Sequence, residues 1–239
     1  MKPYNQNFQV NRVNQNLIEV FRHEPPEYLK EYIPLWNFNF WMYMETDRHF
    51  VNTLGNFLES IEQTIIDQYE PVHDSSTGLG NNTVTSRSHH YNLFRETAPV
   101  ALHLHKIIKS QITRYLEQTN PKIFQDPNFD PHINCWFNVM APGEEIKSHT
   151  HNVTNPFISG HFTVRCENSY TYYIVPYTRD RIEMTNNIGE GIIFPSYMEH
   201  GTSIHQGNAN RISIAWDLYY NKDDTFDTIK NNVEPVDLK

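Results

Sequence analysis

The spacing of apolar residues changes near residue 130, from a helical repeat to a strand repeat. Before that point, residues 50–69 carry apolar side chains three and four positions apart, which predicts an amphipathic helix. A second stretch with this spacing runs from Pro99 to about Glu117, and proline is favoured in the first turn of a helix. The first twenty residues are polar and predict at most one edge strand. We therefore expect residues 1–130 to form a mainly helical support region.

From residue 131 the chain instead shows short runs in which apolar and polar residues alternate, with turn residues between them. This pattern predicts roughly eight strands, as in a sandwich or barrel. The runs cover residues 133–140, 146–153, 156–164, 169–175, 180–185 and 191–195, a short segment at His200, and residues 211–220. The polar tail, residues 220–239, is expected to pack loosely or fray.

The last of these runs is the most informative. Arg211, Ser213 and Asp217 alternate with apolar residues such as Ile212 and Trp216. Because alternate side chains of a strand point to opposite faces, the apolar face is expected to be buried under the helices. The polar face would then line a cavity.

Composition narrows the class of protein. A net charge of −9 disfavours non-specific binding to nucleic acid or to an anionic membrane surface. The two cysteines, Cys135 and Cys166, do not suggest a disulfide scaffold. No apolar run approaches the ~20 residues of a membrane span, and the N-terminus lacks the apolar core of a signal peptide. We expect residues 1–239 to form a single, soluble, cytoplasmic domain.

The histidines supply the first candidate chemistry. His149 and His151 lie two residues apart in a predicted strand, so both side chains would reach one metal ion, and His200 would join them from a distant strand. Such a set leaves coordination positions for substrate and dioxygen. His103 and His105 have the same spacing, but residues two apart on a helix do not face each other. We interpret that second pair as partly exposed helix residues.

Arg211 supplies the second candidate. A buried arginine requires an anion, and its planar guanidinium binds a carboxylate through two hydrogen bonds. A bound dicarboxylate would meet this requirement. The other interpretation is a structural ion pair of Arg211 with Asp217 or Glu190.

At these residues the chain resembles the 2-oxoglutarate/Fe(II)-dependent oxygenases, in particular their prolyl-hydroxylase-like group in bacteria and phages. The resemblance spans about residues 134–218, and a weaker similarity covers Ser86 to Phe94, a loop that we expect to shape substrate access. It rests on N-x-x-x-P-G-x(5)-H-x-H (Asn138 to His151), I-S-G (Ile158 to Gly160), G-x-x-x-F-P-S-x-x-x-H-G (Gly189 or Gly191 to Gly201) and R-I-S-I (Arg211 to Ile214).

The resemblance implies an α+β, mainly β fold: a double-stranded β-helix, or cupin-like jelly-roll, at residues 131–219, backed by N-terminal helices. It implies Fe(II) bound by His149, His151 and His200. It also implies 2-oxoglutarate as cosubstrate, anchored by Arg211 and Ser213. The expected reaction is hydroxylation with release of succinate and carbon dioxide.

Two further residues enter through the same resemblance. Asn138, on the strand before the histidine pair, is a candidate hydrogen-bond donor to the cosubstrate. His151 stands where the superfamily usually carries a carboxylate, so three neutral imidazoles would leave the metal its full charge of +2. That set favours an anionic cosubstrate, and it also brings the site closer to three-histidine dioxygenases and zinc sites. Glu144 and Glu145 are the nearby acids that could act beside the metal ligands.

Three hypotheses therefore stay open. The first is the 2-oxoglutarate-dependent oxygenase. The second is a three-histidine dioxygenase or zinc site without 2-oxoglutarate, and the third is a non-catalytic jelly-roll binding module. The substrate could be a small metabolite, a protein side chain, a nucleobase or a sugar, and the negative charge makes long nucleic acid the least favoured partner.

Overall fold

The structure of the chain is a computed structural model that describes residues 8–22, 27–32, 35–72, 76–151, 155–176 and 179–238. The strands are β1 (Phe8–Arg12), β2 (Leu17–Arg22), β3 (Asn37–Met44), β4 (His132–Met140), β5 (Ile158–Arg165), β6 (Tyr170–Ile174), β7 (Arg181–Thr185), β8 (Glu190–Pro195), β9 (Glu199–Thr202), β10 (Arg211–Tyr219) and β11 (Glu234–Pro235). The α-helices are α1 (Arg48–Gln68) and α2 (Pro99–Thr119), and short 3-10 helices cover Glu27–Leu29, Thr85–Arg87, Leu93–Arg95, Pro121–Gln125 and Lys222–Asp224.

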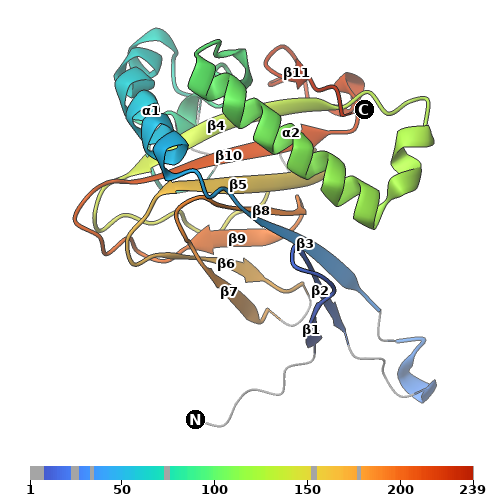
Figure 1. The fold of residues 1–239 in the computed structure, drawn as a ribbon. Helices are drawn as coiled ribbons and strands as arrows, with labels where there is room; N and C mark the ends of the chain where they lie inside the picture. The colour runs from blue at the N-terminus through green and yellow to red at the C-terminus, as the bar shows by residue number, and fades with distance from the viewer. Residues whose placement is uncertain are drawn as a thin grey trace.

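Within the described residues the strands form two antiparallel sheets (Figure 1). The larger sheet has the order β1-β2-β3-β8-β5-β10-β4-β11, and the smaller has the order β7-β6-β9. From β5 onward the chain crosses repeatedly between the two sheets, as a jelly-roll requires. The ring of Tyr173 on β6 lies 5.1 Å from that of Phe194 on β8, centroid to centroid, so the sheets pack face to face. The predicted mainly β jelly-roll is confirmed.

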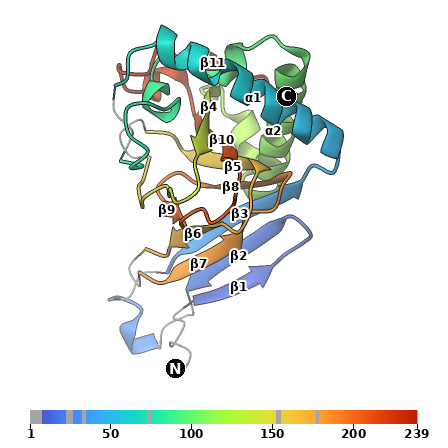
Figure 2. The same ribbon diagram turned by 90° about the vertical axis from the view of Figure 1, so that its left-hand side faces the viewer.

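The helices cover the outer face of the larger sheet, above β4, β10 and β5 (Figure 1, Figure 2). Their apolar side chains share one core with the apolar face of β10, including Ile212, Ile214 and Trp216. Asp47 caps α1 by accepting a hydrogen bond of 3.0 Å from the backbone N–H of Phe50, and α2 begins at Pro99. Both predicted helices are therefore confirmed, and the polar face of β10 is left to the space between the sheets.

The N-terminal region forms more sheet than expected. β1, β2 and β3 extend the larger sheet beyond β8, and in Figure 1 they reach away from the helices. Val20 and Phe40 are fully buried in a second core cluster with Phe8 and Tyr173. The prediction of at most one edge strand was wrong, because the aromatic residues that cover β2 come from β3 and the smaller sheet.

The C-terminal tail also packs more firmly than predicted. β11 pairs with β4, and Ile229, Val233 and Val236 are buried. These apolar residues are spaced irregularly among polar ones, so their pattern does not predict a helix or a strand. In the fold each of them fills a gap beside β4 and β10. The expectation of a loose tail was therefore wrong.

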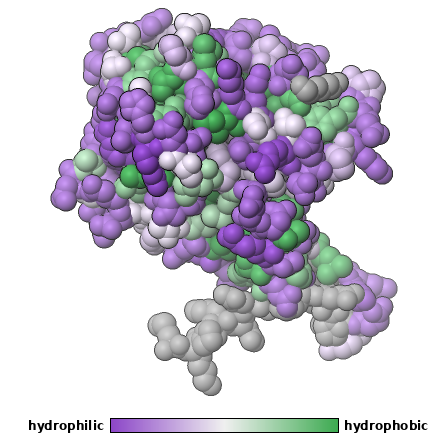
Figure 3. Space-filling view, viewed as in Figure 1, coloured by the Kyte–Doolittle hydropathy of each residue, from purple (hydrophilic) through white to green (hydrophobic). Residues whose placement is uncertain are grey.

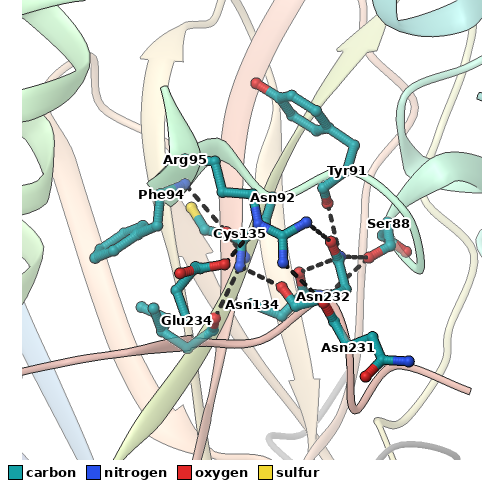
Figure 4. A network of polar contacts seen from close by, with 11 residues as sticks. Ser88, Tyr91, Asn92, Phe94, Arg95, Asn134, Cys135, Asn231, Asn232 and Glu234 are labelled. Carbon is teal, nitrogen blue, oxygen red and sulfur yellow. Dashed lines mark hydrogen bonds and ion pairs between the residues drawn. The ribbon is translucent and has the colours of Figure 1, made fainter. Parts of the chain in front are cut away.

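Asn232 attaches this tail to the sheet (Figure 4). Its amide nitrogen donates to the carbonyl oxygens of Ser88 at 2.9 Å and Tyr91 at 3.0 Å, and to Oδ1 of Asn134 at 3.1 Å. The main-chain carbonyl oxygen of Asn232 accepts a hydrogen bond from the side chain of Asn92 at 2.7 Å. The tail therefore supports the loop that carries Ser88 and the strand that carries Asn134.

The face in Figure 3 is mostly hydrophilic, with apolar patches between the helices and on the part that β1 to β3 form. Val10, on the outer strand β1, is 57% exposed. None of the helices in the described ranges combines the length and hydrophobicity needed to cross a membrane.

Candidate metal centre

The segment that carries His149 and His151 is a loop between β4 and β5, not the strand that the alternation predicted. It contacts β9 of the smaller sheet through an isolated bridge, in which the N–H of His149 donates to the carbonyl of His200 at 2.9 Å and the reverse bond measures 3.0 Å. The N–H of Thr202 also donates to the carbonyl of Ile146 at 2.9 Å. Asn152 and Val153, the end of the predicted strand, lie outside the described residues. The two histidines still meet, because the bridge holds their loop against β9.

The structure brings the three predicted histidines together. One ring nitrogen of each of His149, His151 and His200 lies within 4.8 Å of the others. The ring centroids of His149 and His200 are 4.5 Å apart, and the Nε2 atoms of His149 and His151 are 3.3 Å apart. His200 is buried, and its side chain lies deepest of the three.

The hydrogen bonds of these rings define which nitrogen faces inward. Nδ1 of His149 lies 2.9 Å from the carbonyl oxygen of Lys147, and Nδ1 of His200 lies 2.9 Å from that of Met198. A carbonyl oxygen only accepts, so each Nδ1 carries the proton and each Nε2 presents a lone pair. Burial, and then the neighbouring His149 and His151, hold the pKa of His200 well below its usual value, which keeps its ring neutral. Converging lone pairs repel one another, and a shared cation would stabilise them.

His151 differs from the other two because its Nδ1 faces a carboxylate. Oδ1 of Asp217 lies 2.5 Å from Nδ1 of His151, and Asp217 is only 3% exposed. The acids suggested by the sequence, Glu144 and Glu145, are exposed, and Glu144 accepts from the backbone N–H of Ala141. The acid beside the metal ligands is therefore Asp217. The alternation of residues along β10 predicts that Asp217 faces the cavity. From the sequence, however, Asp217 was considered only as an ion-pair partner for Arg211.

A narrow inner pocket of about 50 Å³ leads from these histidines to the other predicted residues, Asn138, Arg211 and Ser213. Nδ2 of Asn138 donates to Oγ of Ser213 at 3.5 Å, and Oδ1 of Asn138 accepts from Oγ1 of Thr85 at 2.5 Å. Thr85, which sequence reasoning missed, directly precedes the loop that resembled the oxygenases. Its contact fixes the amide of Asn138 so that its nitrogen faces Ser213.

Arg211 is buried in this pocket with an exposed fraction of 2%. Among the described residues no carboxylate lies within ion-pair distance of it, so its expected alternative partners, Asp217 and Glu190, do not pair with it. Nη1 contacts Sδ of Met140 at 3.3 Å, and Nε has no hydrogen-bond partner in the described part of the chain. Burial lowers the pKa of Arg211, but an arginine remains a cation in proteins. The pocket therefore presents a positive charge that no described carboxylate neutralises.

A larger cavity of about 420 Å³ opens on the other side of the histidines. Both cavities are lined by Thr77, Trp136, His149 and His151, so they meet at the candidate metal position. The walls of the outer cavity include Ser88 and His89, from the loop expected near the substrate. His105, by contrast, is buried and bonds to the carbonyl of Leu93 at 3.0 Å, which corrects its predicted partial exposure.

No model of a known protein family matches the sequence. No curated protein matches it either. Among solved structures, a Pseudomonas putida prolyl-4-hydroxylase matches 75% of this chain and 92% of its own, at 9% identity and a TM-score of 0.53. A Trichoplax adhaerens prolyl hydroxylase, solved with a peptide fragment of the hypoxia-inducible factor oxygen degradation domain, matches 76% of this chain and 83% of its own, at 10% identity and a TM-score of 0.51. The chain therefore has the fold of these prolyl hydroxylases, as its motifs predicted.

Proposed function

We propose that this protein is an Fe(II)- and 2-oxoglutarate-dependent oxygenase that hydroxylates its substrate and releases succinate and carbon dioxide. The observation that carries the proposal is the position of Arg211, a buried cation without a carboxylate partner among the described residues, in one pocket with three converging imidazoles. A dicarboxylate with a metal-chelating end suits both ends of that pocket.

The Nε2 atoms of His149, His151 and His200 would hold the metal. Three neutral nitrogen ligands suit a divalent iron and leave positions for a bidentate cosubstrate and for dioxygen. When bound, Fe(II) supplies the oxidative chemistry that couples decarboxylation of 2-oxoglutarate to hydroxylation. The protein supplies geometry: the bridge between His149 and His200 and the backbone acceptors of their Nδ1 atoms fix two of the rings.

Arg211 and Ser213 would hold the distal carboxylate of 2-oxoglutarate, with Asn138 as a further donor. Burying an unpaired charge costs several kcal/mol, and a carboxylate bound to the guanidinium offsets that cost. The pocket is narrow, which favours a slender diacid over a broad ligand. These residues are inside the jelly-roll, where low polarity strengthens the ion pair.

The outer cavity would hold the substrate. Its volume of about 420 Å³ is typical of sites for small molecules, and its mouth could equally admit a protein side chain. Trp136 lies at the junction of the two cavities, with its ring 6.2 Å from that of His151 between centroids. The indole would exclude water from the metal position and orient the substrate above it.

The three neutral histidine ligands are also compatible with a second candidate function. Three imidazoles also suit zinc or a three-histidine dioxygenase that acts without 2-oxoglutarate. That rival gives Arg211 no role, whereas the proposed function uses it directly.

Anaerobic absorption spectroscopy separates these functions. Metal-free protein is mixed with Fe(II) and then titrated with 2-oxoglutarate, and we expect the visible charge-transfer band of the chelate. Arg211→Ala should need at least tenfold more 2-oxoglutarate, because a partner of a buried ion pair is lost. The control is Arg165→Ala, whose guanidinium is partly exposed and pairs with Glu59 at 2.6 Å. Metal binding without the band would favour the rival, and no metal binding would leave a non-catalytic module.

A further inference from the structure

Three buried side chains form a short chain of hydrogen bonds behind the candidate metal position. Ser159 on β5 and Asp217 on β10 lie directly opposite each other in the larger sheet. Oγ of Ser159 donates to Oδ1 of Asp217 at 2.5 Å, and Nδ1 of His151 lies 2.5 Å from the same oxygen. Ser159 is fully buried and Asp217 nearly so. The carboxylate therefore fixes both the orientation of the His151 ring and the nitrogen that carries its proton.

The charge of Asp217 is not balanced by any cationic side chain in the described ranges. Its ion-pair contact is with His151, and no lysine or arginine of the described ranges lies within ion-pair distance of it. Burying a carboxylate without a cation is costly. A divalent metal on Nε2 of His151 would place positive charge on the far side of the same ring. The carboxylate is therefore positioned to be stabilised by the metal.

The Nδ1 atoms of the other two rings contact a different kind of acceptor. His149 and His200 direct Nδ1 to backbone carbonyl oxygens, which carry no net charge. At His151, by contrast, Nδ1 faces the carboxylate of Asp217. It is also the position at which the similar oxygenases are expected to carry a carboxylate ligand. One imidazole thus stands between the metal position and the negative charge.

We propose that Asp217, held by Ser159, is a positioning residue that supplies negative charge to the metal centre through His151, in place of a directly bound carboxylate. This inference rests on the metal centre of the proposed function and extends it. A carboxylate that accepts a hydrogen bond from Nδ1 makes Nε2 a more basic metal ligand and fixes the direction of its lone pair. Two positive charges on the metal and one negative charge on Asp217 sum to +1, the same as for a site with one carboxylate ligand.

The test measures Co(II) binding to metal-free protein, by titration and by the visible ligand-field spectrum, without any cosubstrate. Asp217→Asn keeps an oxygen that can accept from His151 but removes the charge. We expect its affinity for Co(II) to fall by about 10- to 100-fold, with a shifted ligand-field band at saturation. The metal-free variant should melt at the same temperature as the wild type or higher. A merely structural role would lower that melting temperature and leave the band unmoved.

Two further variants keep the result decisive. Glu145→Gln removes the same charge from an exposed residue of the His149 loop, and its affinity should stay within about twofold of wild type. Ser159→Ala should weaken Co(II) binding less than Asp217→Asn, and it decides the matter if that variant does not fold. Wild-type affinity in both Asp217→Asn and Ser159→Ala would overturn this inference and leave the proposed function intact. No Co(II) binding by the wild type would overturn the metal centre and this inference together, whereas a failure to bind 2-oxoglutarate would overturn only the proposed function.

Discussion

His149 and His200 exchange two backbone hydrogen bonds, of 2.9 and 3.0 Å, which join the loop of the histidine pair to β9. The two rings are therefore held close together by the backbone, independently of any ion. A preformed site loses little conformational entropy when metal binds. The fold should accordingly survive without metal, and the metal should add stability to it.

Metal removal tests this expectation. Chelation should leave the far-ultraviolet circular dichroism spectrum unchanged. Adding Fe(II) or Mn(II) at about 100 times its dissociation constant should stabilise the fold by about 2.7 kcal/mol, or a rise of about 5–10 °C in melting temperature. His200→Ala should lose this rise. Unfolding of the chelated protein would show that the backbone bridge does not hold the site.

Arg211 should strengthen cosubstrate binding but lower the free energy of unfolding of the ligand-free protein. Arg211→Met replaces a buried cation that has no carboxylate partner among the described residues with an apolar chain of similar length, and should raise the free energy of unfolding of the metal-free protein by about 1–2 kcal/mol. Urea denaturation measures this. A loss of more than 1 kcal/mol would mean that contacts with protein groups such as Sδ of Met140, rather than a ligand, satisfy the guanidinium.

Asn232 should stabilise the fold by joining the tail to the loop and the strand that line the outer cavity. Asn232→Ala removes donors to three buried acceptors, and should lower the free energy of unfolding by about 2–3 kcal/mol. The matched control is the adjacent Asn231→Ala: its side chain is exposed, and its main-chain carbonyl, which the substitution keeps, accepts from Arg95. Equal stability of the two variants in urea would show that the network adds nothing.

His161 should make the metal-free protein less stable in acid. Burial, and then the charge of Arg211, lower its pKa to about 3, whereas an unfolded histidine titrates near 6.5. Between these values the unfolded chain binds the extra proton, so stability is full above about pH 6.5 and falls as the pH drops towards 3. His161→Gln should reduce the slope of unfolding free energy against pH by up to about 1.4 kcal/mol per pH unit. An unchanged slope in urea denaturation from pH 7 to 4 would contradict this.

The helical spacing of apolar residues and their alternation with polar residues were enough to predict both helices, most strands of the jelly-roll and the cavity-facing side of β10. They failed where long-range contacts decide the structure. β1 and β2 depend on aromatic residues of β3 and β6, and the tail depends on gaps beside β4, neither of which a local window contains. The histidine loop shows the reverse case, since its alternation suggested a strand, but its described residues form an isolated bridge and no continuous strand.

The candidate site could be largely assembled from motifs, because most of its residues lie on predictable strands and the histidine pair belongs to a recognisable sequence motif. Asp217 and Ser159 were harder to find. Each alternates correctly on its strand, but their pairing depends on the register of β10 against β5, which the sequence does not display. Thr85 was missed for the same reason, since only the folded loop brings it to Asn138.

X-ray absorption spectroscopy of the Fe(II)-loaded protein tests the three-histidine centre most directly, because it counts imidazole ligands around the metal. The wild type should show three imidazole nitrogens at about 2.0–2.2 Å, and His151→Ala should show two. A first shell with fewer than three imidazoles in the wild type, or with a protein carboxylate in place of His151, would contradict this account.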